Sequence, residues 1–350
     1  MDKQKIQKIL EAAAKAPSGD NMQPWSFEIL GDGSEVALFN LPEKDDSYYN
    51  YQQKASYIAH GAVLENIVIA AQQLGAGADI ELFPESLNPD LVAKIKFSPQ
   101  QAQEHPLYPA IFSRNTNRFF FKQQPIAGDV ISQMLEHNNN DSLKLYLETE
   151  RQKIQSLAKI LKINDRLVFE IKSIHSFLFD KIRWNKQQVE STQDGMPIGT
   201  LGLTVLEQLF FPLLKFWHVV KAFNGVGLSR IVGLKGWIGS RNASMLGMIS
   251  MKSTDNRAFV ESGRLLQRIW LESAKQGLAF QPVIGLSLLI YRAENDALSE
   301  LSFAHRQLIL KARSALIEFF NLDSSEFLVT GFRIGAPIKR PVSTLRRPIR

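Results

Sequence analysis

The sequence predicts a mixed α+β fold in which two related halves of one chain form an intrachain pseudo-dimer. Helical and strand patterns follow one another within each half, and two long apolar helices carry glycines at the same separation. The 350 residues, 45% hydrophobic and 22% charged, are enough for two average domains or for one large domain built from a duplicated unit. We expect residues 1–108 to form the first half and residues 109–350 the second.

The first half begins with an amphipathic helix. Charged and apolar residues alternate at helical spacing over residues 3–14, and Pro17 with the turn-rich run after it stops the helix. The other elements expected here are strands at 25–30 and 35–39 joined across Gly31, Asp32 and Gly33, a helix at 55–74 and a strand at 80–83. Pro84, Pro89 and Pro99 then predict irregular structure.

The second half starts near Pro109 and echoes the order of the first. Its expected elements are a basic turn at 114–118, a helix from Pro125 to Leu135, a strand at 143–147, helices at 150–162 and 165–190, a strand at 245–251, a helix at 263–277 and a strand at 286–291. This repetition of turn, helix and strand favours an internal duplication.

The pair of glycine-bounded helices gives the best sequence evidence for duplication. Residues 61–75 and 263–277 each begin and end with glycine, and their apolar positions agree, as Leu64 and Leu266 illustrate. Small residues such as Gly61 would let the two helices approach closely at a pseudo-twofold interface.

A long helical insertion is expected at about 150–244, and its most unusual part is the apolar stretch at 203–223. Glu207, Lys215, His218 and Lys221 interrupt this stretch, which argues against a membrane span, and Pro212 should kink the helix. Three interpretations stay open: a lid or packing helix, an oligomer interface, or contact with a membrane surface.

Composition excludes several classes of function. Without cysteine there is no disulfide, thiolate zinc site, Fe–S cluster or cysteine nucleophile, and a reducing compartment fits. The N-terminal segment lacks the apolar core of a signal peptide, so we expect a cytoplasmic protein. The net charge of +6 is spread along the chain, which disfavours nucleic-acid binding.

Hydrolase and metal chemistry are also disfavoured. No Gly-x-Ser-x-Gly elbow is present, which argues against a serine hydrolase. The six histidines are far apart and include no pair at ligand spacing: His60, His105, His137, His175, His218 and His305. We therefore expect no metal site.

A turn at residues 17–25, here called the Pro-Ser turn, is the first of four clusters with chemical potential. Ser18, Asn21 and Gln23 lie between two prolines, directly after a helix and before a strand. The turn is either a simple helix stop or a rigid frame that offers hydrogen bonds to a planar heterocycle.

The second cluster is the basic segment at 114–118. In an extended chain Arg114, Thr116 and Arg118 project to one side, where two forked guanidinium groups and a hydroxyl can converge on one phosphate. A solvated basic loop is the alternative.

Two further clusters lie in the C-terminal part of the chain. The loop at 277–285 includes Pro282, Ile284 and Gly285, whose backbone can lie against a ligand ring and offer an N–H to it, although a plain loop into the next strand is the alternative. The tail from 333 is rich in cations, with Arg346 and Arg347 near its end, and a disordered basic end is the alternative.

In order and over nearly its whole length, the chain resembles the nitroreductase family of FMN-dependent flavoproteins. In that family an Arg-x-Ser/Thr-x-Lys/Arg segment holds the FMN phosphate, and Arg114, Thr116 and Arg118 match it residue by residue. A C-terminal Arg that assists the phosphate resembles Arg346, with Arg347 as a neighbour able to replace it.

The same resemblance gives roles to the turn and the loop. The family's Pro-Ser-x-x-Asn-x-Gln-Pro-Trp turn reaches the flavin ring from the opposite subunit of a dimer, and Ser18, Asn21 and Gln23 match it. A Pro-x-x-Gly loop whose backbone N–H faces flavin N5 resembles the segment from Pro282 to Gly285, so Ile284 and Gly285 inherit that role.

One departure from the family pattern is informative. The first half has the Pro-Ser turn but no phosphate segment, whereas the second half has the phosphate segment. This resembles a fused, pseudo-dimeric branch in which one chain builds one complete site and a long insertion covers the flavin. The segment Asp194–Pro197 and the apolar stretch after it resemble that lid.

The resemblance implies FMN as cofactor and hydride transfer from NAD(P)H through flavin N5 to a nitroaromatic or quinone-like acceptor, with no acid or base side chain required. Two alternatives remain: a protein that stores or sequesters FMN, and a binding or scaffold protein without flavin. The internal pairing makes a monomer feasible, and a homodimer is the other arrangement we consider.

Overall fold

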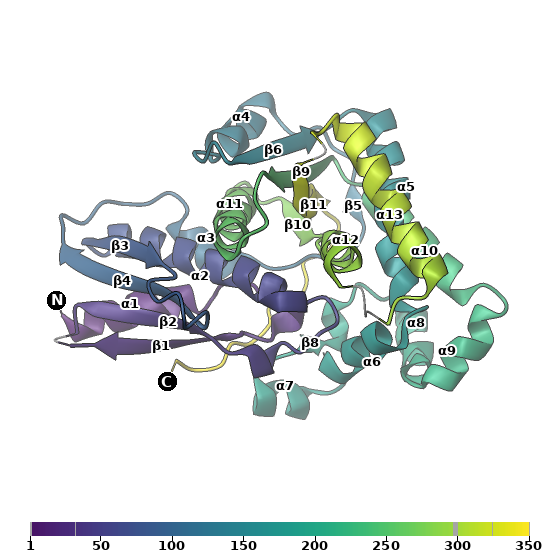
Figure 1. The fold of residues 1–350 in the computed structure, drawn as a ribbon, viewed down its shortest axis with the longest axis horizontal. Helices are drawn as coiled ribbons and strands as arrows, with labels where there is room; N and C mark the ends of the chain where they lie inside the picture. The colour runs from purple at the N-terminus through teal and green to yellow at the C-terminus, as the bar shows by residue number, and fades with distance from the viewer. Residues whose placement is uncertain (1, 32, 297–299, 324, 350) are drawn as a thin grey trace.

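The computed structural model describes residues 2–31, 33–296, 300–323 and 325–349 and confirms the mixed α+β fold. Two antiparallel sheets lie on either side of a central pair of helices, with further helices on one flank (Figure 1). The first sheet has the strand order β1-β2-β4-β3, and the second has the order β10-β11-β9-β6 with β5 added beside β11.

The first sheet belongs to the first half of the chain. Its strands are β1 (Trp25–Leu30), β2 (Glu35–Asn40), β3 (Ala76–Leu82) and β4 (Leu91–Pro99). The predicted hairpin of β1 and β2 is confirmed, although Asp32 lies outside the described residues. Gly31 and Gly33 have φ values of +56° and +88°, which explains why glycine stands on both sides of the turn.

The prediction of irregular structure after residue 83 was wrong, because β4 occupies most of that segment. It pairs with both β2 and β3 and buries Val92, Ile95 and Phe97 against the core. Pro84 and Pro89 precede the strand and Pro99 ends it, so none of the three interrupts a central ladder.

The second sheet is formed by strands from widely separated parts of the chain. They are β5 (Phe121–Lys122), β6 (Leu143–Glu148), β9 (Met245–Met251), β10 (Ala279–Pro282) and β11 (Phe327–Pro337). The expected strands at 143–147 and 245–251 are confirmed. Strand β11, between β9 and β10, was not expected, and Arg333 lies buried within it rather than in a tail.

The strand predicted at 286–291 is instead the helix α12 (Gly285–Asn295). An unbroken apolar run fits a buried strand and a buried helix equally well, so periodicity alone could not decide. The true strand, β10, comes just before it.

Two long helices form the centre of the molecule, α2 (Lys54–Gln73) and α11 (Asn256–Lys275). A Cβ on Gly61 would lie 2.0 Å from the carbonyl oxygen of Val260, and a Cβ on Gly263 would lie 2.0 Å from that of Ile58. The two glycines therefore let the backbones touch in a reciprocal manner, as a pseudo-twofold axis would require. The duplication itself stays a prediction.

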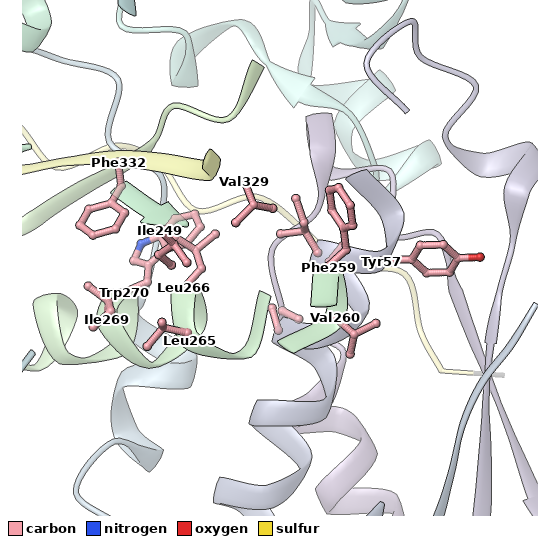
Figure 2. Packing of buried hydrophobic residues seen from close by; sticks show 14 of the residues in the cluster. Tyr57, Ile249, Phe259, Val260, Leu265, Leu266, Ile269, Trp270, Val329 and Phe332 are labelled. Carbon is pink, nitrogen blue, oxygen red and sulfur yellow. The ribbon is translucent and has the colours of Figure 1, made fainter. Parts of the chain in front are cut away.

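Apolar side chains continue this interface into both sheets. Figure 2 shows Leu266 and Trp270 of α11 packed beneath Ile249 of β9 and Phe332 of β11, with Phe259 further along the same helix toward Tyr57 of α2. These side chains are almost completely buried, and they join the second sheet to the central helices in one core.

The remaining helices lie around this core. They are α1 (Lys3–Ala13), α3 (Tyr108–Ser113), α4 (Gly128–Glu136), α5 (Arg151–Val168), α6 (Lys172–Lys181), α7 (Lys186–Thr192), α8 (Val205–Phe210), α9 (Trp217–Asn224), α10 (Leu228–Arg241) and α13 (Phe303–Phe320). Single 3₁₀ turns occur at Gly19–Asn21, Pro42–Lys44, Tyr51–Gln53, Ile198–Thr200 and Phe211–Lys215.

The expected helices at 150–162 and 165–190 were divided at the wrong place. Helix α5 runs through to Val168, and the chain then breaks again after Lys181 to form β7 (Ile182–Arg183), which pairs in parallel with β8 (Met196–Pro197). Ile171, just before α6, and Ile182, just after it, have extended backbone angles, so they separate α6 from α5 and from β7.

The apolar stretch is broken near Pro212, as predicted. Helix α8 ends at Phe210, a 3₁₀ turn follows, and α9 begins at Trp217. Because the helix is broken, the polar residues of the stretch lie on separate elements: Glu207 in α8, Lys215 in the 3₁₀ turn, and His218 and Lys221 in α9. Among the described residues, no helix is long and apolar enough to cross a membrane.

Candidate anion and cofactor site

A cavity of about 260 Å³ lies between the Pro-Ser turn, the segment at 114–118 and the C-terminal tail. Six of the predicted site residues line it: Ser18, Asn21, Arg114, Thr116, Arg118 and Arg346. Lys15 adds a fourth cation, and Met196 and Thr200 of the insertion complete the wall. We call this site the cation cavity.

The segment at 114–118 is held in place from both sides. It leaves α3 at Arg114 in an extended conformation, and the backbone N–H of Asn117 donates to the carbonyl oxygen of Phe280 at 2.8 Å. The Asn117 side chain donates to the carbonyl oxygen of Lys339 at 2.7 Å. These bonds fix the segment between β10 and the C-terminal tail.

The guanidinium of Arg114 is positioned by packing and by one hydrogen bond. It lies 4.3 Å from the Trp270 ring centroid and donates to the carbonyl oxygen of Lys15 at 3.0 Å, while its Nε has no partner. Arg118 donates to the carbonyl oxygen of Thr200 at 3.5 Å and to Sδ of Met196 at 3.3 Å. Among the described residues neither guanidinium forms an ion pair with a carboxylate, although burial lowers the pKa of Arg118 and the charge of buried Asp20 opposes that shift.

The charge of the cavity is unbalanced. Lys15, Arg114, Arg118 and Arg346 line it, and its described lining includes no Asp or Glu. Burial, and then the nearby charge of Arg346, lower the pKa of Arg114 to about 9, and burial lowers the pKa of Arg346 to about 10. An anion bound between them would reverse both effects, because it would stabilise the charged guanidinium groups.

The Pro-Ser turn has an uncommon backbone. Asp20, Asn21 and Gln23 have φ values of +44°, +60° and +52°, in the left-handed region that residues other than glycine rarely adopt. The Ser18 hydroxyl accepts a hydrogen bond from the Gln23 N–H at 2.8 Å and closes the turn. Such strain persists only where the surroundings enforce it, and it is typical of functional sites.

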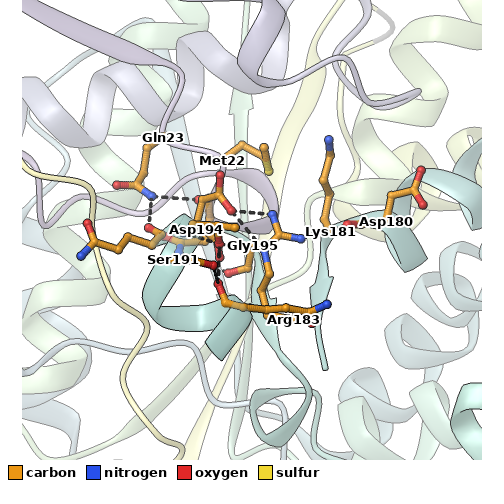
Figure 3. A network of polar contacts seen from close by, with 12 residues as sticks. Met22, Gln23, Asp180, Lys181, Arg183, Ser191, Asp194 and Gly195 are labelled. Carbon is orange, nitrogen blue, oxygen red and sulfur yellow. Dashed lines mark hydrogen bonds and ion pairs between the residues drawn. The ribbon is translucent and has the colours of Figure 1, made fainter. Parts of the chain in front are cut away.

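The turn is tied to the insertion (Figure 3). The Gln23 amide donates to the carbonyl oxygen of Gln193 at 2.9 Å, and Asn21 donates to that of Gly195 at 3.2 Å. Arg183 and Asp194 pair at 2.5 Å and brace the same segment. The insertion therefore lies directly on the turn that was predicted to face a flavin ring.

Gln23 and Arg347 do not line the cavity. Gln23 Oε1 accepts the backbone N–H of Arg347 at 2.8 Å, and the Arg347 side chain donates to the carbonyl oxygen of Met22. Arg346 points to the cavity, where its Nη1 donates to Oγ1 of Thr344 at 2.7 Å. The tail thus contacts the turn, in contrast to a disordered basic end.

The loop of Pro282, Ile284 and Gly285 is not brought to the cation cavity. It joins β10 to α12, and a Cβ on Gly285 would lie 2.3 Å from Oδ1 of Asn164. That oxygen accepts a hydrogen bond from the Tyr49 hydroxyl at 2.9 Å. A polar group of Tyr49, Asn164 and Asp165 therefore lies on this side.

Electrostatic effects connect this group to the cavity. Burial raises the pKa of Asp165 to about 6, although Asn164 and the charge of Arg333 oppose the shift. Burial lowers the pKa of Arg333 to about 10. The charge of Asp165 opposes this shift, and the charge of Arg118 in the cavity adds to it. Sequence reasoning missed Tyr49, Asn164 and Asp165, because single polar residues on a loop and a helix carry no recognisable motif.

The fold and site define an α+β protein with a cation-lined cavity, and sequence comparison shows which proteins it is similar to. The model described as "Nitroreductase family" matches residues 1–45. A Mycobacterium tuberculosis protein named as a candidate NAD(P)H nitroreductase, acg, is 29% identical over 201 residues, 56% of this chain and 58% of that relative. These two matches show that the chain is similar to members of the nitroreductase family.

Other similarities are more distant. An uncharacterised M. tuberculosis protein, MT1398, is 24% identical over 289 residues, which are 79% of this chain and 38% of the relative. A nitroreductase with bound FMN from Bacteroides fragilis covers 69% of this chain and 95% of its own at 11% identity, with a TM-score of 0.36.

Proposed function

We propose that this protein binds FMN with its phosphate in the cation cavity and transfers hydride from NAD(P)H to a small nitroaromatic or quinone-like acceptor. The observation that carries the proposal is the group of four cations without a carboxylate in the described cavity lining. A phosphate supplies the missing negative charge and accepts several charge-assisted hydrogen bonds. The names of relatives such as acg agree with a nitroreductase activity.

The unsatisfied polar atoms of the cavity fit a phosphate and its polyol chain. Nε of Arg114 is a buried donor without a partner, and Oδ1 of Asn21 is a buried acceptor without one. A phosphate oxygen suits the first and a hydroxyl group suits the second. Thr116 adds a hydroxyl between the two arginines.

We assign the remaining predicted residues to the flavin ring and its surroundings. When bound, FMN supplies the hydride acceptor and donor chemistry. Backbone N–H groups of Ile284 and Gly285, after Pro282, would stabilise negative charge on the ring, and Gln23 with Arg347 would hold the Pro-Ser turn. In this proposal both halves of one chain build a single site, so a monomer is sufficient.

Storage of FMN is the second candidate, and the position of the insertion favours it. Met196 and Thr200 accept hydrogen bonds from Arg118, while Gln193 and Gly195 accept them from the Pro-Ser turn. A segment fastened at four points over the cavity would retain flavin and restrict the approach of nicotinamide. Turnover would require this segment to move.

The test is an anaerobic absorbance spectrum of the FMN-reconstituted protein before and after addition of NADPH and then NADH. Bleaching of the flavin band supports the reductase. A bound flavin that neither nucleotide bleaches supports storage. Protein that stays colourless after FMN is offered contradicts both functions and favours a binding or scaffold role without flavin.

A further inference from the structure

We propose that the apolar side of the insertion docks this protein on an anionic membrane surface. The surface, here called the apolar patch, begins with the exposed side chains Val205, Leu206, Leu209, Phe210, Leu213 and Phe216 and continues over residues 223–234. This proposal is independent of the proposed FMN binding, because it rests on a different surface of the protein.

The patch is exceptional within the described residues. Of the 19 large hydrophobic side chains that are exposed, ten lie between residues 205 and 234. Leu209 is 70% exposed and Val226 is 79% exposed. Concentrations of this kind mark surfaces that contact another phase or partner, because scattered apolar residues are the norm on a soluble surface.

The patch is rigidly supported from below. Phe211, Leu214 and Trp217 alternate with the exposed residues and pack on Phe169 and Phe179 in a small separate core. The imidazole Nε2 of His175 lies 2.8 Å from the carbonyl oxygen of Leu214. Near Pro212 the helix gives way to a 3₁₀ turn, so this turn and α9 keep one side in the core, whereas no described residue of α8 is buried.

The positive charge beside the patch favours an anionic lipid surface over a second copy of the protein. From residue 201 to 240 the sequence includes four cations, Lys215, Lys221, Arg230 and Lys235, and a single acid, Glu207. Glu207 pairs with Lys235 at 2.6 Å, while Lys215, Lys221 and Arg230 are exposed without an ion-pair partner among the described residues. Two such surfaces placed face to face would repel, whereas anionic lipid complements the charge.

The free cations lie next to the apolar side chains. A surface cleft of about 760 Å³ between α9 and α10 is lined by Lys221, Arg230 and Val226, and the one acid in its described lining, Glu170, is already paired with Arg166 and His305. Val226 belongs to the patch, so apolar insertion and headgroup contact would occur together. Shallow insertion of apolar side chains with cations at the headgroup level is how interfacial helices bind membranes without spanning them.

The experiment is vesicle co-sedimentation of the full chain. Vesicles of phosphatidylcholine alone are compared with vesicles that also include phosphatidylglycerol, at low and high salt. We expect binding to the phosphatidylglycerol vesicles that salt weakens. Lys221→Gln with Arg230→Gln should lower the partition coefficient about 30-fold, since each basic residue near an anionic surface contributes about fivefold.

Leu209→Ser with Phe216→Ser should lower binding at least about tenfold, because both side chains would leave the lipid. Leu87→Ser with Phe303→Ser is the matched control, since these apolar residues are even more exposed but lie outside the patch. Thermal melts check that each variant is folded. Wild-type protein that ignores phosphatidylglycerol, or patch variants that bind like the control, would overturn the proposal.

A second copy is the competing occupant, and sedimentation velocity distinguishes it. Membrane docking predicts that the patch variants leave the sedimentation coefficient unchanged. A wild-type dimer that Leu209→Ser with Phe216→Ser dissociates would overturn the membrane proposal and assign the patch to self-association.

Discussion

Two clusters of partly or fully buried cations lie in this molecule, and they differ in what balances them. In the cleft beside α10, Glu170 accepts hydrogen bonds from Arg166 at 2.7 Å and Ser229 at 2.8 Å, and His305 lies 3.4 Å away. In the cation cavity, Arg114 and Arg346 face one another without a carboxylate. In the first cluster Glu170 balances Arg166 and His305, whereas no carboxylate of the described residues lines the second, so we expect an anion from outside to complete it.

The pKa values express the same difference. Burial alone would raise the pKa of Glu170, but hydrogen bonds from His305, Arg166 and Ser229 outweigh it and lower the pKa to about 2. In the cavity, burial lowers the pKa of Arg114 to about 9 with no carboxylate to oppose it. A cluster that disfavours its own charged form is a better marker of a ligand site than the number of its cations.

The largest expected effect concerns FMN retention. Replacing Arg114 and Arg118 together by Gln removes the charge-assisted hydrogen bonds to the phosphate and should weaken FMN binding at least about 100-fold. Quenching of flavin fluorescence on titration measures this. Lys153→Gln with Lys186→Gln changes the net charge equally at exposed positions and should leave affinity unchanged. Equal affinity of both double variants would remove the cavity as the phosphate site.

The second effect concerns stability. A variant without the Glu170 carboxylate would leave the cations of this cleft unbalanced, as those of the cation cavity are. Glu170→Gln removes the balancing charge and should lower the free energy of unfolding by about 2–3 kcal/mol at pH 7. Urea denaturation measures the change. Because the pKa of Glu170 is lowered from 4.5 to about 2, this contribution is present above pH 4.5 and is lost as the pH falls through about 2.

Its control is Glu190→Gln, which breaks only an exposed pair with Lys186 and should change stability by less than about 0.5 kcal/mol. If the two variants are equally stable at pH 7, Glu170 does not balance its cluster. If their difference persists undiminished toward pH 2, the electrostatic explanation is wrong.

A smaller effect separates two neighbouring arginines. Arg346 lines the cavity and Arg347 contacts Met22 instead, so Arg346→Lys should weaken FMN binding about tenfold and Arg347→Lys less than about twofold. The same fluorescence titration compares them. The reverse order would show that Arg347, not Arg346, assists the phosphate.

The smallest effect uses inorganic phosphate on the protein without flavin. At ten times its dissociation constant, phosphate should stabilise the wild type by about 1.4 kcal/mol, and chloride at equal ionic strength should not. Thermal unfolding measures the shift. Glu170→Gln should keep the response, while the Arg114 and Arg118 double variant should lose it. A response retained by that double variant would place the anion elsewhere.

Sequence patterns predicted the parts of this fold that have long, uninterrupted periodicity. The amphipathic spacing of α1, the glycine-bounded helices α2 and α11, and the β1–β2 hairpin were all readable. The strand β4 and the helix α12 were not. In β4 nearby prolines hid an interior strand, and in α12 an apolar run carried no period that separates helix from strand.

The candidate site divides in a similar way. Arg114, Thr116 and Arg118 were found because alternate positions of a short extended segment project together. Tyr49, Asn164 and Asp165 were missed because their proximity depends on α5, which belongs to the insertion, packing against a loop of the first half. A local sequence pattern cannot reveal contacts between residues so far apart in the chain.

The contact of Gly61 with Val260 and of Gly263 with Ile58 limits how this chain can be divided. Helix α11 covers one side of α2, so a fragment ending near residue 108 would expose that apolar side to water. Replacing either glycine by alanine would require the two helices to move apart, so substitutions at the two positions are coupled. We therefore expect the two halves of the chain to fold together as one cooperative unit, and neither half to be stable when expressed alone.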